Sequence, residues 1–456
     1  MTQLVASASY TNAFEQIQRD HAGPAAIADL RRVAFDRFST NGLPTTSSEE
    51  WRFTNVRRIA DTTFVSGHAV ALTNEELAPF NVTGSLGGWP TIVFVNGHYQ
   101  AALSSVAELP DGVVVESLAN VLNSSPGNPV VEQYLGKGAD IHSDSAAFAA
   151  LNTALFGDGV FVHVAANVVV ESPIQVLFVT TPRSTDSDTT EYPMTHPRIL
   201  IAVEENSEIR LVENYGGEGN TPYLTNAVTE VFGGANAVID HYKLVREASA
   251  AYHIGHMHLQ LSRGANFSAH AITLGGNIVR NDTMAVLDGE GVSCTLNGLY
   301  IANRQQLVDN HTTIHHAKPH CESHELYKGI LDDQAHAVFN GKIVVAIDAQ
   351  KTDAKQTNKA LLLSEDAQIN TKPELEIFAD DVKCTHGATI GQLDAEAMFY
   401  LRARGLGLEQ ARSVLIHAFA SDLLNRIGIA SIRAGLDELL LAQLPGSGDS
   451  GFYEFG

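Results

Sequence analysis

The sequence predicts a mainly β protein whose centre is a stacked parallel β-coil between helical terminal regions. Between residues 158 and 393, apolar and polar residues alternate in runs such as VFVHVAANVVV and AHAVFNGKIVV, which is the period of a strand. Polar or glycine turns precede the later runs, and the second residues of successive turn pairs are 28, 30, 27, 42 and 33 positions apart. These pairs are Glu205-Asn206, Gly233-Gly234, Arg263-Gly264, Glu290-Gly291, Asp332-Asp333 and Glu365-Asp366.

The length of this repeat distinguishes between the fold classes that are built from repeated units. A propeller blade takes about 40–45 residues, and helical repeats need a helical period that this region lacks. In a β-coil, each rung buries the apolar face of its neighbour, which suits a strand-only repeat of roughly 30 residues. The longest gap contains a histidine-rich segment and has room for one more turn. An antiparallel sandwich is the alternative that periodicity leaves open.

Residues 1–157 are predicted to form a helical and mixed N-terminal domain. Apolar residues recur at helical spacing from Ile27 to Phe38, and Pro24 suits a helix start. The run TIVFVNGHY, residues 91–99, predicts a hairpin because Asn-Gly favours a tight turn. Residues 113–122 and 145–155 are typical of short helices or of the segments leading into them. We place the boundary with the β region near Asp158.

Helical spacing returns after Gly391 and predicts a C-terminal helical domain at 394–435. Asp394 is a suitable cap for the first helix, and Gly405 and Gly407 separate it from the next one. The second helix carries an apolar stripe of Leu408, Ala411, Leu415, Ala418, Phe419 and Leu423. Part of this stripe is expected to dock a partner. Residues 436–456 are predicted to be a flexible tail.

Composition excludes several kinds of partner. The 456 residues include 29 basic and 52 acidic side chains, a net charge of −23, which disfavours nucleic acid and anionic membranes. No apolar stretch reaches the ~18 residues of a membrane helix, and the N-terminus lacks the pattern of a signal peptide. Three cysteines are too few and too far apart for a disulfide framework, so we expect a cytoplasmic protein. No phosphate-binding loop pattern occurs, which predicts that the chain has no nucleotide site.

Histidines gather in the segment HTTIHHAKPHCESH, which runs from His311 to His324. On a strand, His311 and His315 lie on one face, and imidazole and thiolate are ligands for zinc, iron or copper. The alternative is a set of polar residues on the solvent face of the coil, and we expect a structural or weakly metal-binding role. A second group places His256 and His258 on one face and His253 on the other.

The more specific pattern is DDVKCTHGATIGQLD, residues 380–394. Cys384 and His386 are two positions apart, so on a strand they share a face and can meet one metal ion or one partner group. They fall at the end of the repeat region, where a strand edge is open to a partner. The alternative is that Cys384 is a small buried apolar residue and His386 a turn residue.

The segment DVKCTHGATIGQLD, followed by FYLRARGL and ARSVLIHAF, resembles the C-terminal signature of the SufB/SufD family. These proteins are scaffold subunits of the SUF iron–sulfur cluster assembly system. The resemblance extends to EEWRFTNV, EGNTPYLTN and DNHTTIHHAKPHCESHELYKGIL and so covers nearly the whole chain. It implies a right-handed parallel β-helix between helical terminal domains.

The resemblance is greater to the SufD type than to the SufB type. SufB-type chains resemble CEHEA at this motif and often carry a C-x-x-C, whereas this chain has CTHGA, with Gly387 at the acidic position, and no C-x-x-C. The SufB type remains the alternative within the family. Outside it, the alternatives are a β-helix carbohydrate-active enzyme and a stand-alone metal-binding protein that uses residues 311–324.

The resemblance also implies roles and partners. His386 matches a histidine that faces a SufB cysteine where the nascent cluster is built, and Cys384 is its neighbour in the motif. Residues 394–427 match the region that docks the ATPase SufC. The chain is then a non-catalytic scaffold in a complex of one SufB, one SufD and two SufC, with transient iron or cluster at the SufB interface. Without SufB, the chain can pair with a second copy.

Overall fold

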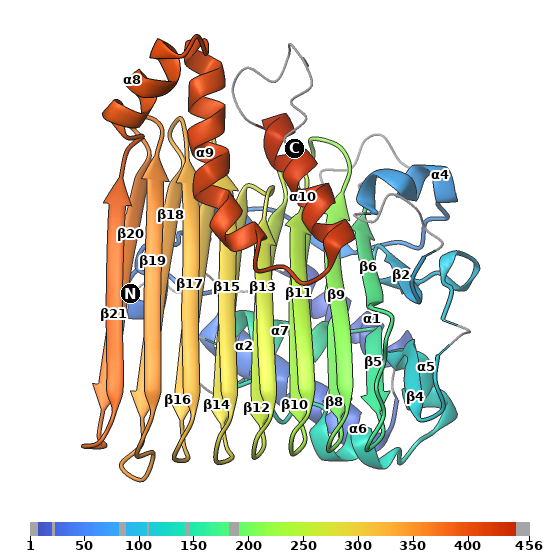
Figure 1. The fold of residues 1–456 in the computed structure, drawn as a ribbon. Coiled ribbons are helices and arrows are strands. Elements are labelled where there is room, and N and C mark those ends of the chain that lie inside the picture. The colour runs from blue at the N-terminus through green and yellow to red at the C-terminus, as the bar shows by residue number, and fades with distance from the viewer. Residues whose placement is uncertain are drawn as a thin grey trace.

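Two facing sheets of parallel strands run through the centre of the molecule, and successive strands alternate between them (Figure 1). The computed structural model describes residues 8–20, 23–81, 88–106, 109–141, 146–181 and 191–443. One sheet contains β5 Gly159–Val164, β8 Arg198–Val203, β10 Leu224–Gly233, β12 Tyr252–Leu261, β14 Ile278–Leu287, β16 Leu307–His316, β18 His336–Val345 and β20 Gln368–Ile377. The other contains β6 Ile174–Thr180, β9 Glu208–Gly217, β11 Val238–Arg246, β13 Asn266–Thr273, β15 Ser293–Ala302, β17 Glu322–Leu331, β19 Asp353–Leu362 and β21 Lys383–Gly391. The parallel β-helix prediction is confirmed, and the antiparallel sandwich is wrong.

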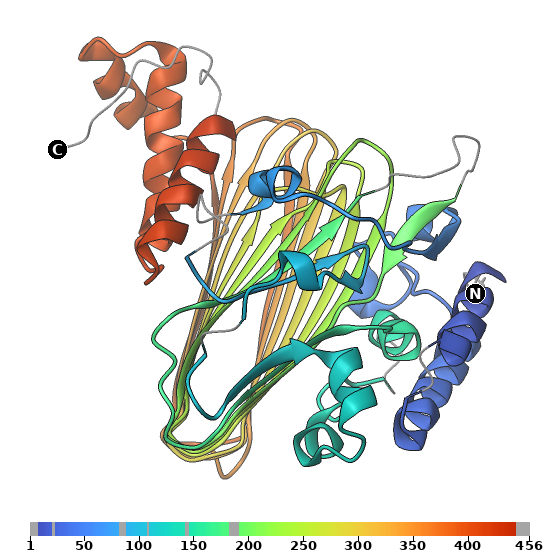
Figure 2. The same cartoon turned by 90° about the vertical axis from the view of Figure 1, so that its right-hand side faces the viewer.

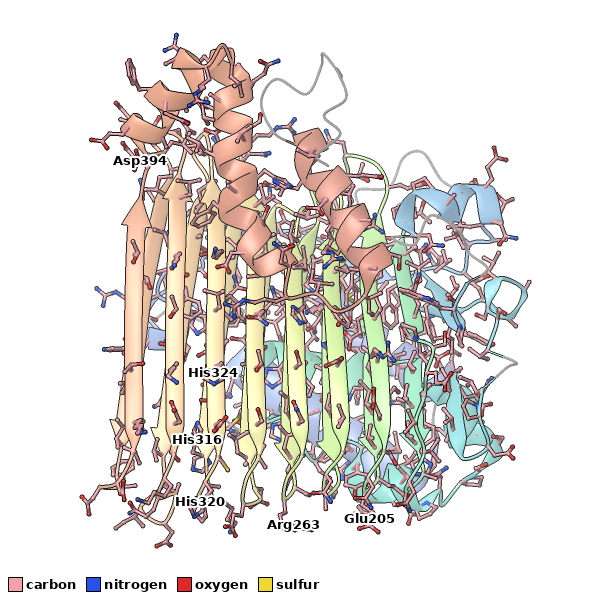
Figure 3. All side chains as sticks on the ribbon, viewed as in Figure 1. Glu205, Arg263, His316, His320, His324 and Asp394 are labelled. Carbon is pink, nitrogen blue, oxygen red and sulfur yellow. The ribbon has the colours of Figure 1, made fainter. Side chains whose placement is uncertain are left out.

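The strand register explains the repeat in the sequence. Leu224 pairs with Tyr252, and the same ladder continues through Ile278, Leu307, His336 and Gln368, so one turn takes 26 to 32 residues. The long gap of 42 contains the expected extra turn, at Pro319 and His320. The gap is long because the next two predicted turns, Asp332-Asp333 and Glu365-Asp366, connect β17 to β18 and β19 to β20 at the opposite end of the solenoid. The labelled residues Glu205, Arg263 and His320 lie at the same end of the solenoid in Figure 3, which shows that this turn belongs with the earlier ones.

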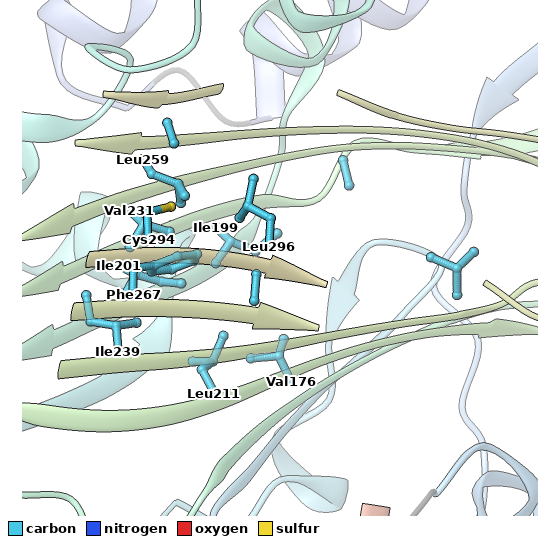
Figure 4. Close-up of a cluster of buried hydrophobic side chains, with 14 of the residues drawn as sticks. Val176, Ile199, Ile201, Leu211, Val231, Ile239, Leu259, Phe267, Cys294 and Leu296 are labelled. Carbon is cyan, nitrogen blue, oxygen red and sulfur yellow. The ribbon is translucent and has the colours of Figure 1, made fainter. Parts of the chain in front are cut away.

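Apolar side chains fill the space between the two sheets. Figure 4 shows inward-pointing residues from successive strands in contact, and all of those labelled are at most 1% exposed. They are Val176, Ile199, Ile201, Leu211, Val231, Ile239, Leu259, Phe267, Cys294 and Leu296. Burying one such side chain contributes about 1.5–3 kcal/mol, so this interior stabilises the stack of rungs.

Most of the N-terminal region covers the outer face of the sheet that contains β10, whereas Leu77 and Phe80 pack with Leu177 and Val179 of β6 in the other sheet. Its helices are α1 Ala8–Asp20, α2 Ala25–Asn41, α3 Arg57–Ala60, α4 Asn74–Leu77, α5 Leu118–Ser124, α6 Pro129–Tyr134 and α7 Ala147–Leu155. Trp51 and Phe148 pack with Leu224, Tyr252 and Ile278 of the sheet in one buried cluster.

Strands of the N-terminal region extend both sheets. The predicted hairpin is confirmed as β2 Thr91–Val95 and β3 His98–Tyr99, with Asn96 and Gly97 both at positive φ. β2 pairs with β6, and β4 Val113–Ser117 pairs with β5, while β1 Phe64–Ser66 pairs with β7 Tyr192–Thr195. Hydrogen-bonded sheet therefore continues across the boundary predicted near Asp158.

Three C-terminal helices follow the last strand: α8 Ala395–Ala403, α9 Leu408–Leu424 and α10 Ala430–Gln443. Asp394 caps α8 as expected, because its Oδ1 accepts the backbone N–H groups of Glu396 and Ala397. α9 and α10 lie against the outer face of the second sheet, on the side away from the N-terminal helices (Figure 2).

Two predictions about these helices need correction. Of the predicted stripe in α9, Ala411 and Leu423 are buried, whereas Leu408 and Ala418 are exposed, and Ile416, Ala420 and Leu424 are the other buried residues of this helix. α9 carries apolar residues on more than one face, so spacing alone does not decide which face meets the sheet. The predicted tail is helical up to Gln443, because Leu436 and Leu440 are buried one turn apart against the same cluster. Residues 444–456 lie outside the described residues.

Candidate functional site

Cys384 and His386 lie on β21, the terminal strand of its sheet. Within the described chain β21 pairs along one edge only, with β19, where Cys384 is opposite Ala354 and His386 is opposite Gln356. Ala354 and Gln356 are buried and face the interior of the solenoid. Paired residues of parallel strands point to the same side, so Cys384 and His386 share a face, as predicted, and this face points inward. His386 is nevertheless exposed, since no further described strand covers it.

The three cysteines occupy different environments, and all three are free thiols. Cys294 and Cys321 are buried in the solenoid, and burial raises the pKa of both. Cys384 is partly buried beside Ile343 and Val345, and its pKa is raised by burial and by the Asp353 carboxylate. A raised pKa keeps the thiol protonated near neutral pH, so Cys384 becomes a thiolate ligand only when a metal displaces its proton.

Two polar side chains in the rungs before His386 were not predicted from the sequence. Gln356 donates through Nε2 to Oε2 of Glu325 at 2.7 Å, and both residues are buried. Burial raises the pKa of Glu325 to about 7. The signal for this pair was the repeat itself, because Glu325, Gln356 and His386 occupy the same position in three successive rungs.

The open end of the solenoid also exposes apolar side chains. Ile377 and Phe378 at the end of β20, and Ile390 near the end of β21, are exposed large hydrophobic residues. Unpaired strand edges next to exposed apolar residues are a template for another chain. This end therefore has the character of an interface.

A second exposed surface, the α8/α9 groove, lies between the first two C-terminal helices. Its lining comprises Ala395, Glu396, Ala397, Phe399, Tyr400, Leu401, Val414 and Leu415. Phe399 and Tyr400 are 75% and 56% exposed, and α8 contributes no buried residue. The groove was only partly predicted, because the apolar stripe placed Leu415 on it and omitted the two aromatic residues of α8.

The histidines of residues 311–324 do not converge. His311 and His315 share the outer face of β16, as expected, whereas His316 points inward and hydrogen-bonds Ser323 at 2.9 Å. His320 lies at the turn, and His324 lies on the outer face of the other sheet, so its ring points away from the interior into which His316 points (Figure 3). Among the described residues, no group of three or more His, Cys, Asp or Glu side chains is arranged to hold a metal ion.

The second histidine group is divided as predicted. His253 points into the solenoid and contacts Glu247 at 3.0 Å, while His256 and His258 lie on the outer face of β12. Burial lowers the pKa of His258 to about 4. A neutral, buried imidazole is a packing group here.

Comparison with known proteins decides the family. A model of the SUF system FeS cluster assembly SufBD core domain matches residues 184–419, and one of the SufBD protein N-terminal region matches residues 5–176. The chain belongs to the SufBD family of iron–sulfur cluster assembly proteins. This membership favours cluster assembly over the carbohydrate-active and stand-alone metal-binding alternatives.

Individual SufBD relatives are similar over most of their length. An iron–sulfur cluster assembly SufBD family protein of Synechocystis is 34% identical over 430 residues, 92% of each chain. SufD of Escherichia coli is 31% identical over 89% of this chain and 90% of its own, and SufD of Bacillus subtilis is 28% identical over 95% and 97%. These SufD relatives confirm the resemblance to the SufD type.

Two segments that carried the SufBD resemblance meet in space. Within EEWRFTNV, Thr54 hydrogen-bonds Asp309, and Glu50 lies 3.3 Å from the His311 ring. Arg280 contacts Asp309 at 2.7 Å and lies over the Trp51 ring at 3.9 Å. This charged clamp holds the N-terminal region against β14 and β16.

Proposed function

We propose that this chain is a non-catalytic, SufD-type scaffold subunit that offers His386 to iron or a nascent cluster at its junction with a SufB-type subunit. One observation carries the proposal: His386 is exposed on the terminal strand, at a position where the corresponding side chains of earlier rungs are buried. An exposed imidazole at an open sheet edge is accessible both to a metal ion and to a second chain.

The ligand set at this end is incomplete without a partner. His386 and Cys384 supply at most two donors, and the described residues around them add no third. Iron and iron–sulfur clusters take thiolate and imidazole ligands, so a partner's cysteine is the natural complement. Neutral imidazole binds iron without adding negative charge, and it holds a cluster less tightly than a second thiolate, which suits a scaffold that must release its product.

The α8/α9 groove is proposed to receive a SufC-type ATPase. Its exposed aromatic residues offer a large apolar contact, and aromatic anchors contribute much of the binding energy of protein interfaces. Since the sequence has no phosphate-binding loop pattern, ATP hydrolysis is assigned to that partner. The proposed complex contains one SufB-type chain, this chain and two ATPase chains.

The proposed compartment is the cytoplasm, where all three thiols of the chain stay reduced. Among the described residues, no helix combines the length and the apolar character needed to cross a membrane. When the SufB-type partner is absent, the open end of the solenoid is proposed to pair two copies of this chain.

The test replaces His386 in the co-expressed complex. His386→Ala is expected to leave folding and assembly intact but to lower cluster formation from iron and sulfide at least tenfold, while His386→Cys keeps part of it. His320→Ala, which removes an exposed histidine at a solenoid turn, is the matched control. Cluster formation at the parent rate in His386→Ala, both in this assay and in maturation of an iron–sulfur enzyme in cells, would show that the assignment is wrong.

A further inference from the structure

We propose that Gln356 is a positioning residue for His386: its side-chain carbonyl accepts the imidazole N–H that does not face the metal, and Glu325 fixes the direction of the amide. The proposal rests on the proposed function of His386. It concerns residues of three successive rungs, which are 30 and 31 positions apart along the chain.

The strand register brings the three side chains into one column. Glu325 of β17 is paired with Gln356 of β19, which is paired with His386 of β21. Neighbouring strands lie about 4.8 Å apart, and paired residues point to the same side. His386 therefore lies one strand spacing from Gln356, on the same inward face.

The amide of Gln356 has a fixed direction. Its Nε2 donates to Oε2 of Glu325 at 2.7 Å, which turns its Oε1 away from that carboxyl. The space around the amide is made by Gly341, where a Cβ would come within 2.2 Å of Gln356 Nε2. The amide therefore contacts one strand of each sheet, β17 through Glu325 and β18 through Gly341.

The side-chain carbonyl oxygen of Gln356 is an acceptor that no donor of the described residues reaches. Gln356 is only 2% exposed, yet its Oε1 has no hydrogen-bond partner among the described residues. Buried carbonyl oxygens nearly always accept a hydrogen bond, so a donor is missing at this position. His386, on the next strand and the same face, is placed to supply it.

A metal-binding imidazole needs such an acceptor. One ring nitrogen gives its lone pair to the metal, and the other keeps its proton, which an outer hydrogen-bond partner holds in place. This second contact selects the tautomer and the ring orientation, and its loss typically costs 10–100-fold in metal affinity. An amide acceptor does so without adding a negative charge beside the cluster.

The first measurement is the tautomer of the His386 ring in the full-length chain. Ring ¹⁵N shifts are recorded at pH 8, above the Glu325 pKa of about 7, and the His386→Ala spectrum assigns the signals. We expect one dominant tautomer in the parent and a mixture in Gln356→Met. Asn358→Ala is the control, because Asn358 is the next inward residue of β19 and is paired with Ala388 instead of His386.

The second measurement is cluster formation from iron and sulfide in the co-expressed complex. Gln356→Met is expected to lower it about tenfold, while Asn358→Ala stays near the parent. The double variant Glu325→Gln/Gln356→Glu exchanges donor and acceptor, retains an acceptor for His386, and is expected to restore the single tautomer.

The outcomes separate this proposal from the one on which it rests. If His386→Ala leaves cluster formation unchanged, the proposed function fails. If His386→Ala abolishes it but Gln356→Met keeps the parent tautomer and rate, only the role of Gln356 is overturned. Should Gln356→Met fail to fold, the double variant decides, and a tautomer mixture in a folded double variant overturns the proposal.

Discussion

At the scale of single residues, His311 shows how a candidate ligand can serve as a charged structural group. Burial opposes its positive charge, but the carboxylates of Asp309 and Glu50 outweigh burial and raise its pKa to about 9. The pKa of Asp309 falls to about 2 because His311 and Arg280 outweigh its own burial. The imidazolium is therefore part of the clamp at neutral pH.

This pKa predicts how stability depends on pH. A histidine whose pKa rises on folding, here from about 6.5 to about 9, stabilises the fold fully below pH 6.5 and loses that contribution as pH rises through 9. His311→Gln should therefore lower the free energy of unfolding most at pH 6, by up to roughly 3 kcal/mol, and by less at pH 9.5. Urea unfolding at the two pH values measures this difference. His320→Asn, an exposed histidine, is the control. An equal effect of His311→Gln at both pH values would contradict the charged clamp.

At the scale of elements, α9 has a core face and an outer face. Ile416, Ala420 and Leu423 pack on the sheet, and Lys328 of β17 anchors the helix by contacting the Phe419 carbonyl and Asp422. Val414 and Leu415 lie in the α8/α9 groove. A single helix can therefore hold the C-terminal region on the solenoid and present a surface to a partner.

The two faces predict opposite outcomes for one kind of substitution. Phe399→Asp should release the SufC-type ATPase from the complex while circular dichroism and thermal unfolding stay near the parent. Ile416→Asp buries a charge in the core and should destabilise the protein by several kcal/mol. Global unfolding of Phe399→Asp, or full retention of the ATPase, would remove the docking role from the groove.

At the scale of the whole molecule, the two ends of the solenoid differ. N-terminal strands cover one end, where β2 and β4 extend the sheets beyond β6 and β5. At the other end, β20 and β21 each have one edge that no strand of the described residues pairs with, and Phe378 and Ile390 are exposed. A β-solenoid with one open end needs a cover, because an open edge invites pairing with other chains.

If the open end is the junction with the SufB-type partner, substitutions there should release that partner. Phe378→Asp with Ile390→Asp should abolish binding of that subunit, as measured by native mass of the co-expressed complex, while the ATPase stays bound. Phe399→Asp should show the reverse, so each variant is the control for the other surface. Val169→Asp, at an exposed apolar residue elsewhere on the solenoid, should change neither. Retention of the SufB-type subunit in the double variant would exclude this end as the junction.

The sequence alone favoured the correct architecture and determined one part of the site. Strand alternation and turn spacing are local properties, so they predicted the β-coil, its missing turn and the shared face of Cys384 and His386. The face of α9 that meets the sheet and the continuation of helix to Gln443 depend on which apolar side chains find a partner surface. Local spacing does not contain that information.

Only the tertiary structure decided which distant residues became neighbours. His386 beside Gln356, and His311 beside Glu50, result from strand register and from the packing of the N-terminal region. Register is set by the summed burial of every inward side chain across two sheets, because a slip of one residue would turn the apolar set outward. No short stretch of sequence contains this information, so the neighbours of His386 are defined only once the strands are in register.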